Sequence, residues 1–159
     1  MQRQPRVFLG NTTFTKVQAT TGTISFTNMP VTVTAAATTA AVTSLTATRL
    51  VDGLNDSLTL SVKTATTLTT FVDSTDENLT IQSSSTGAVT VSTLTAAELS
   101  KLTLTGSGNV TVSALTNASS VASVLTVDSS ALSGAATVNA SGSSIAVSFT
   151  GSNAGSNVF

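Results

Sequence analysis

A short string of alternating apolar and polar residues recurs at nearly constant intervals along this chain. Five such strings are Leu58-Thr59-Leu60-Ser61, Leu79-Thr80-Ile81-Gln82, Leu102-Thr103-Leu104-Thr105, Leu125-Thr126-Val127-Asp128 and Ile145-Ala146-Val147-Ser148. Their first residues are 21, 23, 23 and 20 positions apart. A repeat of this length is typical of a solenoid, in which each turn of the chain stacks on the turn before it.

A second alternating string follows three of the first strings. These second strings are Ala88-Val89-Thr90-Val91, Asn109-Val110-Thr111-Val112 and Ala135-Ala136-Thr137-Val138. Small residues with glycine separate the two strings of each unit, at 83–87, 106–108 and 129–134. Because glycine reaches backbone conformations that β-branched residues cannot, we interpret these segments as corners. The pattern predicts an all-β fold, a repetitive parallel β-solenoid of about 21–23 residues and two strands per turn.

Two features leave alternatives open. Antiparallel hairpins in a β-sandwich also repeat short strands at regular spacing, so a β-sandwich is the alternative fold. Residues 95–99, Thr-Ala-Ala-Glu-Leu, have the capping pattern of one helical turn, although in a solenoid such a segment more often forms a corner. We favour the solenoid over the β-sandwich, and a corner over a helical turn at residues 95–99.

The chain divides by composition into three parts. Residues 1–50 form an N-terminal arm and β-hairpin region, residues 51–150 the solenoid repeats, and residues 151–159 a C-terminal tail or cap. In the first part, 7–9 and 14–17 flank a Gly-Asn turn, and a second turn is expected at 28–30. A basic arm before a rigid body is suited to docking on a neighbouring subunit, and we expect Arg3, Arg6, Phe8 and Phe14 to serve assembly.

The residues for most enzyme mechanisms are missing. The chain has no histidine and no cysteine, which excludes Ser-His and Cys-His nucleophile systems and thiolate metal sites. A carboxylate pair can hydrolyse a glycoside, and some β-solenoids cleave polysaccharides, but few aromatic or basic residues are present to hold a sugar. We therefore expect a protein that is not an enzyme.

Two acidic segments are weak candidates for calcium binding. The denser one holds Asp73, Asp76 and Glu77, and the other holds Asp52 and Asp56. Calcium takes six to eight oxygen ligands, so either segment would need backbone carbonyls or a second chain to complete a site. Neither has EF-hand spacing, and solvated acidic turns are the simpler interpretation. We expect no cofactor, with calcium as the ion to test.

Charge and hydropathy restrict the partners. Charged residues make up 8% of the chain, against about 25% in typical soluble domains, and the net charge is −1. This leaves no electrostatic basis for binding nucleic acid. The sequence shows no apolar run long enough for a signal peptide or for insertion into a membrane. We expect self-association or contact with neighbouring coat or capsid subunits, on an extracellular or virion surface.

The repeats resemble those of a known class of surface proteins. Residues 102–116 and 124–138, within a similar region of about 58–150, resemble the Thr/Ala/Ser-rich β-solenoid repeats of bacterial S-layer and related RTX-type proteins. The resemblance implies lateral packing into a coat, in a family whose members often bind calcium. The calcium nonapeptide of that family is absent here, so no residue inherits a calcium role.

These observations favour a non-enzymatic structural protein that assembles into an external coat, as S-layer proteins do. S-layer proteins are usually several times longer, which would make this chain a fragment. The alternative is a complete small virion protein of a bacteriophage, a capsid decoration protein or a head or tail fibre, docked by its N-terminal arm. A polysaccharide-binding or polysaccharide-cleaving solenoid is a third hypothesis, which predicts an aromatic or acidic groove.

Overall fold

Strands that follow one another in the chain mostly lie in opposite sheets, and each strand pairs with strands about one turn away. All pairs between described strands of the computed structural model are parallel. The description covers residues 16–18, 21–31, 33, 35–38, 42–84, 87–119, 122–154 and 156–159. The predicted parallel β-solenoid is confirmed, and the β-sandwich alternative is wrong because a sandwich requires antiparallel pairs.

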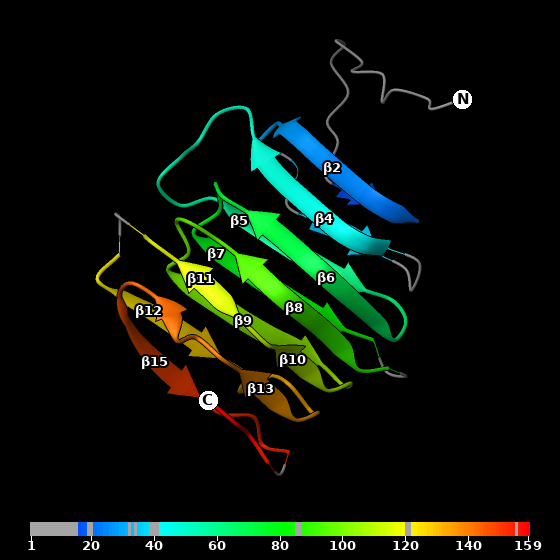
Figure 1. The fold of residues 1–159 in the computed structure, drawn as a ribbon, viewed down its shortest axis with the longest axis vertical. Coiled ribbons are helices and arrows are strands. Elements are labelled where there is room, and N and C mark those ends of the chain that lie inside the picture. Colours follow the sequence, from blue (N-terminus) through cyan, green and yellow to red (C-terminus); the bar gives the residue numbers. More distant parts are fainter. Residues whose placement is uncertain are drawn as a thin grey trace.

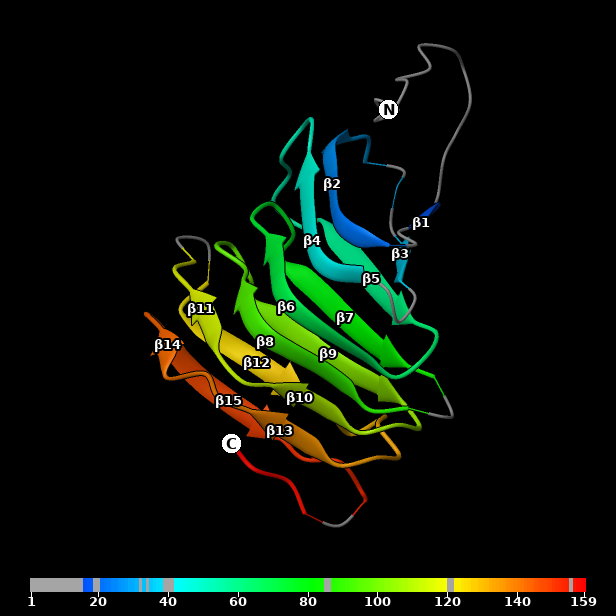
Figure 2. The ribbon, with the colours of Figure 1, turned by 45° about the vertical axis from the view of Figure 1, so that its right-hand side comes forward.

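Two sheets form the broad faces of the solenoid (Figures 1 and 2). The seven-stranded sheet contains, in spatial order, β1 (Lys16–Gln18), β3 (Ala35–Thr38), β5 (Ser57–Val62), β7 (Asn78–Ser83), β9 (Lys101–Gly106), β12 (Val124–Asp128) and β15 (Ala146–Thr150). The other sheet contains β2 (Gly22–Met29), β4 (Val42–Arg49), β6 (Thr66–Asp73), β8 (Val89–Thr95), β10 (Val110–Val112) and β13 (Ala136–Val138), with β11 (Leu115–Asn117) beside β8 and β14 (Gly142–Ser143) beside β11.

Apolar ladders between the sheets form the core. Along β4 to β10, alternation sends most Leu, Val and Ile side chains inward and leaves mainly Thr and Ser on the outer face. In the seven-stranded sheet, Leu58, Leu79, Leu102 and Val127 are successive partners, each at most 1% exposed. In the other sheet the ladder is Leu45, Phe71, Leu94 and Leu115. Burial of each such side chain contributes about 1.5–3 kcal/mol, so the repeat itself supplies the core.

Glycine is required at the corners where successive turns approach most closely. A Cβ on Gly108 would lie 2.1 Å from the carbonyl oxygen of Gly87, and one on Gly134 would lie 2.5 Å from the carbonyl carbon of Gly108. Gly106 has a φ of +102°, which side-chain-bearing residues rarely adopt. The predicted corners at 106–108 and 129–134 are therefore corners in the structure, and their glycines allow the turns to stack.

The residue pairing between neighbouring strands differs from the one obtained by aligning the similar strings with each other. Leu102 pairs with Val127 rather than Leu125, and Leu125 pairs with Val147 rather than Ile145. A shift of two residues keeps every side chain on the same face of the sheet, so apolar alternation cannot distinguish the two registers. Corner length and core packing set the register instead.

The parallel ladders extend N-terminal of residue 51, where the sequence analysis placed the first repeat. β2 pairs with β4 and β1 pairs with β3. Of the turn expected at 28–30, residues 28 and 29 belong to the end of β2. The turn lies just after them, where the Val33 N–H donates to the Pro30 carbonyl at 2.9 Å, and it is a corner that connects strands of different sheets. Residues 1–15, which include most of the predicted first hairpin and all four predicted assembly residues, lie outside the described part of the chain.

Two smaller predictions have a clear outcome. Residues 96–99 make a tight turn, with the Leu99 N–H donating to the Ala96 carbonyl at 3.4 Å, so this segment is a corner and not a helical turn. The C-terminal tail folds back on the last turn. Val158 forms a parallel bridge with Thr137, and the Phe159 ring stacks on Phe149 with centroids 4.5 Å apart.

Candidate functional site

Three successive corner loops bring most of the acidic side chains to one edge of the solenoid. They are residues 50–56 between β4 and β5, 74–77 between β6 and β7, and 96–100 between β8 and β9. Because each loop lies one turn after the previous one, parallel stacking places them side by side (Figure 2). The two acidic segments that the sequence keeps 21 residues apart therefore become neighbours in the structure.

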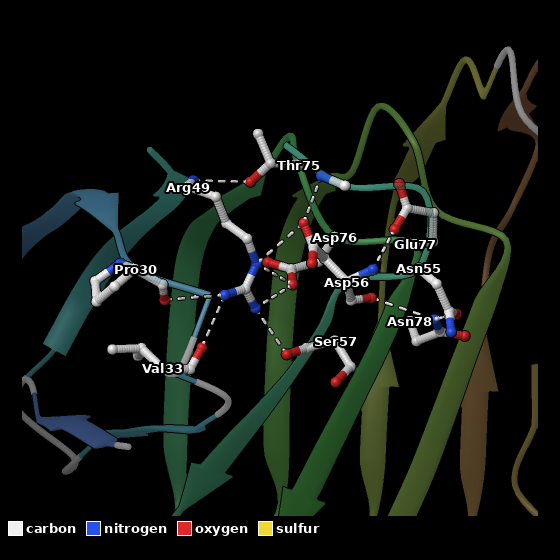
Figure 3. A network of polar contacts seen from close by, with 11 residues as sticks. Pro30, Val33, Arg49, Asn55, Asp56, Ser57, Thr75, Asp76, Glu77 and Asn78 are labelled. Carbon is white, nitrogen blue, oxygen red and sulfur yellow. Dashed lines mark hydrogen bonds and ion pairs between the residues drawn. The ribbon is translucent and has the colours of Figure 1, made fainter. Parts of the chain in front are cut away.

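Arg49, at the end of β4, connects these turns from inside the corner. Its side chain is 1% exposed. Nε donates to Asp76 Oδ1 at 2.9 Å, Nη1 donates to the Val33 carbonyl at 3.0 Å, and Nη2 donates to the Ser57 carbonyl at 2.8 Å (Figure 3). The main-chain N–H of Arg49 donates to Thr75 Oγ1 at 3.0 Å. One guanidinium thus satisfies acceptors from three turns, as its fixed fork of donors allows.

Asp73 and Asp76 form a buried carboxyl pair beside this guanidinium. Both residues are fully buried, and neither oxygen of Asp73 has a donor within hydrogen-bond geometry. Burial, and then the negative charge of Asp76, raise the pKa of Asp73 to about 9. At neutral pH Asp73 is therefore protonated and able to donate to Asp76, whose charge is balanced by Arg49. This part of the corner is a neutral internal network.

Asp56 and Glu77 are held by backbone donors. The Gly53 N–H donates to Asp56 Oδ2 at 2.8 Å, and the Asp56 N–H donates to Glu77 Oε2 at 2.6 Å. Arg49 Nε lies 3.7 Å from Asp56 Oδ2. Glu77 is only 3% exposed, and its second oxygen, Oε1, is buried without a hydrogen-bond partner.

Glu98 completes a group of three carboxylates. One oxygen each from Asp52, Glu77 and Glu98 lie within 4.8 Å of one another. Partial burial, and then the negative charge of Asp52, raise the pKa of Glu98 above its ordinary value. Within the described part of the chain, the ion pairs connect Arg49 with Asp56 and Asp76 and Lys101 with Asp128, so none involves these three carboxylates.

Further along the same corner the loops are polar and uncharged. Asn117 Nδ2 donates to the Leu99 carbonyl at 2.6 Å, and Asn117 Oδ1 accepts from the Ser119 N–H at 2.8 Å. These bonds tie the next loop to the acidic one without adding charge. The acidic character is thus confined to the first three of these stacked loops.

A shallow hollow of about 410 Å³ lies at the opposite end of the same strands. It is lined by Ser61, Val62, Lys63, Gln82, Ser83 and Ser84. Ser61 Oγ donates to Gln82 Oε1 at 2.9 Å, as neighbouring rungs of an outer-face ladder.

The sequence singles out Asp52, Asp56, Asp73, Asp76 and Glu77 but misses two of their partners. The solvated turn expected for Asp73, Asp76 and Glu77 is wrong, because all three residues are buried. Nothing in the sequence around Arg49 marks it as a partner, and Glu98 lies in the 95–99 segment with the capping pattern. For Glu98 the signal is spacing, because it follows Glu77 by 21 residues, one turn of the repeat. Arg49 precedes Asp76 by 27 residues, which is longer than the repeat and gives no such signal.

The described segments include no helix with the length and apolarity needed to cross a bilayer. No protein-family model, no curated protein and no solved structure matches the chain.

Proposed function

We propose that this chain is a non-enzymatic structural subunit of an external coat, and that subunits join through the end of the solenoid. The observation that carries the proposal is the outer edge of β15. Among the described strands, β15 pairs with β12 alone and ends the seven-stranded sheet. An unpaired edge of a parallel sheet offers a row of donors and acceptors to a strand from another subunit.

The direction of the backbone groups on β15 supports strand addition. The Thr150 carbonyl accepts from the Ser129 N–H at 2.9 Å on the β12 side. Because backbone groups alternate in direction along a strand, the N–H groups of Val147 and Phe149 point away from β12. These donors are suited to pairing with an added strand.

The inward side chains of this last turn are incompletely covered. Leu125 and Val127 on β12 are fully buried, whereas Val147 is half-buried and Phe149 is 36% exposed. One more turn, supplied by a neighbour, would bury them as the earlier turns are buried. The C-terminal tail already covers the adjacent edge of β13, since the Val138 N–H donates to the Val158 carbonyl at 2.9 Å.

The broad faces also suit dense packing. Their outward positions are mainly Thr and Ser, and charged residues make up 8% of the chain, so neighbouring faces would meet with little charge repulsion. Few Lys and Arg residues also leave few sites for trypsin-like proteases, which favours survival on an exterior surface.

The test compares two substitutions at one position. Val147→Pro removes an outward N–H, whereas Val147→Ala removes more side-chain volume but keeps that donor. We expect light scattering and electron microscopy to show assemblies for the native chain and Val147→Ala, and loss of assembly for Val147→Pro. Equal assembly by both variants, or a native chain that stays monomeric, would contradict the proposal. Closed symmetric oligomers rather than sheets or filaments would favour the virion protein over the S-layer-like coat.

A further inference from the structure

We propose that Asp52, Glu77 and Glu98 bind a divalent cation, best matched by Ca²⁺, that links three successive turns of the solenoid. Each residue comes from a different corner loop, and one oxygen from each lies within 4.8 Å of the others. This inference goes beyond the proposed assembly function and does not depend on it.

The buried oxygen of Glu77 is the observation that points to a ligand. Glu77 is only 3% exposed. Its Oε2 accepts from the Asp56 N–H, and its Oε1 has no hydrogen-bond partner. Burial of a carboxylate oxygen without a hydrogen-bond donor costs free energy, and this cost is typically larger than for an unpaired neutral polar group. A cation bound by the Glu77 carboxylate would supply a partner for this oxygen.

The surrounding charges leave this group without a counter-ion. The nearby guanidinium of Arg49 is engaged with Asp76 and lies 3.7 Å from Asp56. Among the described residues, no lysine or arginine forms an ion pair with Asp52, Glu77 or Glu98. Three carboxylates in contact repel one another, and a divalent cation relieves that repulsion more fully than a single proton can.

The chemistry of the donors selects a hard cation. Carboxylate oxygens bind Ca²⁺ at about 2.3–2.6 Å, so two ligands on opposite sides of the ion are about 4.6–5.2 Å apart. The three oxygens all lie within 4.8 Å of one another, close enough to share one ion of that size. Mg²⁺ usually keeps several of its waters and takes one or two carboxylates, so a site with three carboxylates suits Ca²⁺ better. Asp52 is exposed and Glu98 half-buried, which leaves room for water ligands to complete the coordination.

The loops are fixed before any ion binds, which lowers the cost of forming the site. The Glu77 carbonyl accepts from the Ser100 N–H at 2.8 Å and from the Lys101 N–H at 2.9 Å, which fixes the second loop to the third. The Gly53 N–H bond to Asp56 closes the first loop on itself. A bound ion would therefore add a cross-link between turns that are already aligned.

The experiment titrates the full chain with CaCl₂ alone and measures binding heat and the temperature of unfolding. Asp52→Asn and Glu98→Gln each remove one ligand charge at positions that are not buried, so both variants are expected to fold. Asp128→Asn is the matched control, because Asp128 is an acidic residue outside the cluster.

We expect the native chain and Asp128→Asn to bind one Ca²⁺ and to unfold at a higher temperature with it, an effect that a chelator reverses. Each cluster variant should bind at least about tenfold more weakly. The titration extends to about 10 mM Ca²⁺, which exceeds the dissociation constants of weak extracellular calcium sites. If neither binding heat nor a shift in unfolding temperature is seen up to that concentration, the proposal is overturned. Equal affinity in native and cluster variants would overturn it as well. Because neither readout is particle formation, failure here leaves the assembly proposal intact.

Discussion

Replacement of Asp73 by Asn tests the description of the buried carboxyl pair. Asp73 is fully buried beside Asp76, and its pKa is about 9, raised by burial and then by the charge of Asp76. In the unfolded chain this carboxyl returns to its ordinary value of 3.8. An asparagine has nearly the same shape as the protonated acid, and its amide can donate to Asp76 in the same way.

The sign and size of the effect follow from the two pKa values. An acid whose pKa is higher in the folded state favours folding fully at low pH, and this contribution is lost as the pH rises through 3.8 toward 9. Each pH unit in that window is worth about 1.4 kcal/mol, so at pH 7 ionisation favours the unfolded chain by about 4 kcal/mol. Asparagine has no such equilibrium, and we expect Asp73→Asn to be more stable at pH 7 by about 1–4 kcal/mol.

The assay is urea unfolding of the native chain and Asp73→Asn at several pH values between 4 and 9. The stability difference should be close to zero at pH 4 and should grow in favour of the variant by up to about 1.4 kcal/mol per pH unit. A variant that is less stable at pH 7, by an amount that does not change with pH, would show that Asp73 is ionised in the folded protein. That result would refute the protonated pair.

Two further substitutions test the remaining structural claims. Asp76→Asn removes the nearer carboxylate partner of the buried Arg49 guanidinium, leaves only the more distant Asp56, and should cost up to about 3–5 kcal/mol in the free energy of unfolding. Asp128→Asn breaks a solvent-exposed ion pair and should cost less than about 1 kcal/mol. Similar losses in both variants would contradict the buried Arg49–Asp76 ion pair. Gly108→Ala places a Cβ 2.1 Å from the carbonyl oxygen of the glycine stacked below and should destabilise by about 2 kcal/mol or more, with exposed Ser107→Ala as the control in the same corner. Thermal and urea unfolding measure this cost, and a Gly108→Ala variant as stable as the control would argue against close stacking of the corners.

The architecture was predictable because its signals are local and repeated. Each Leu-Thr-Leu or Val-Thr-Val string encodes inward and outward faces by itself, and the small residues between strings mark the corners. What the strings could not encode is register. Leu102 pairs with Val127, a shift of two from the matching string, because face alternation is unchanged by an even shift.

The candidate site was predictable only in part. The sequence identified acidic residues in two segments, but contact between the segments depends on stacking of turns whose lengths vary. Glu98 joins Asp52 and Glu77 because its loop is next in the stack, while its local sequence suggested only a turn. Arg49 could not be distinguished from surface cations, because its burial depends on acceptors that are contributed by Val33, Ser57 and Asp76.

Electron cryomicroscopy of the assembled protein tests the proposed function most directly. The account predicts that the outer edge of β15 pairs with a strand of a neighbouring subunit and that Val147 and Phe149 become buried at the junction. Subunits joined only through their broad Thr/Ser faces, with the β15 edge open to solvent, would contradict it.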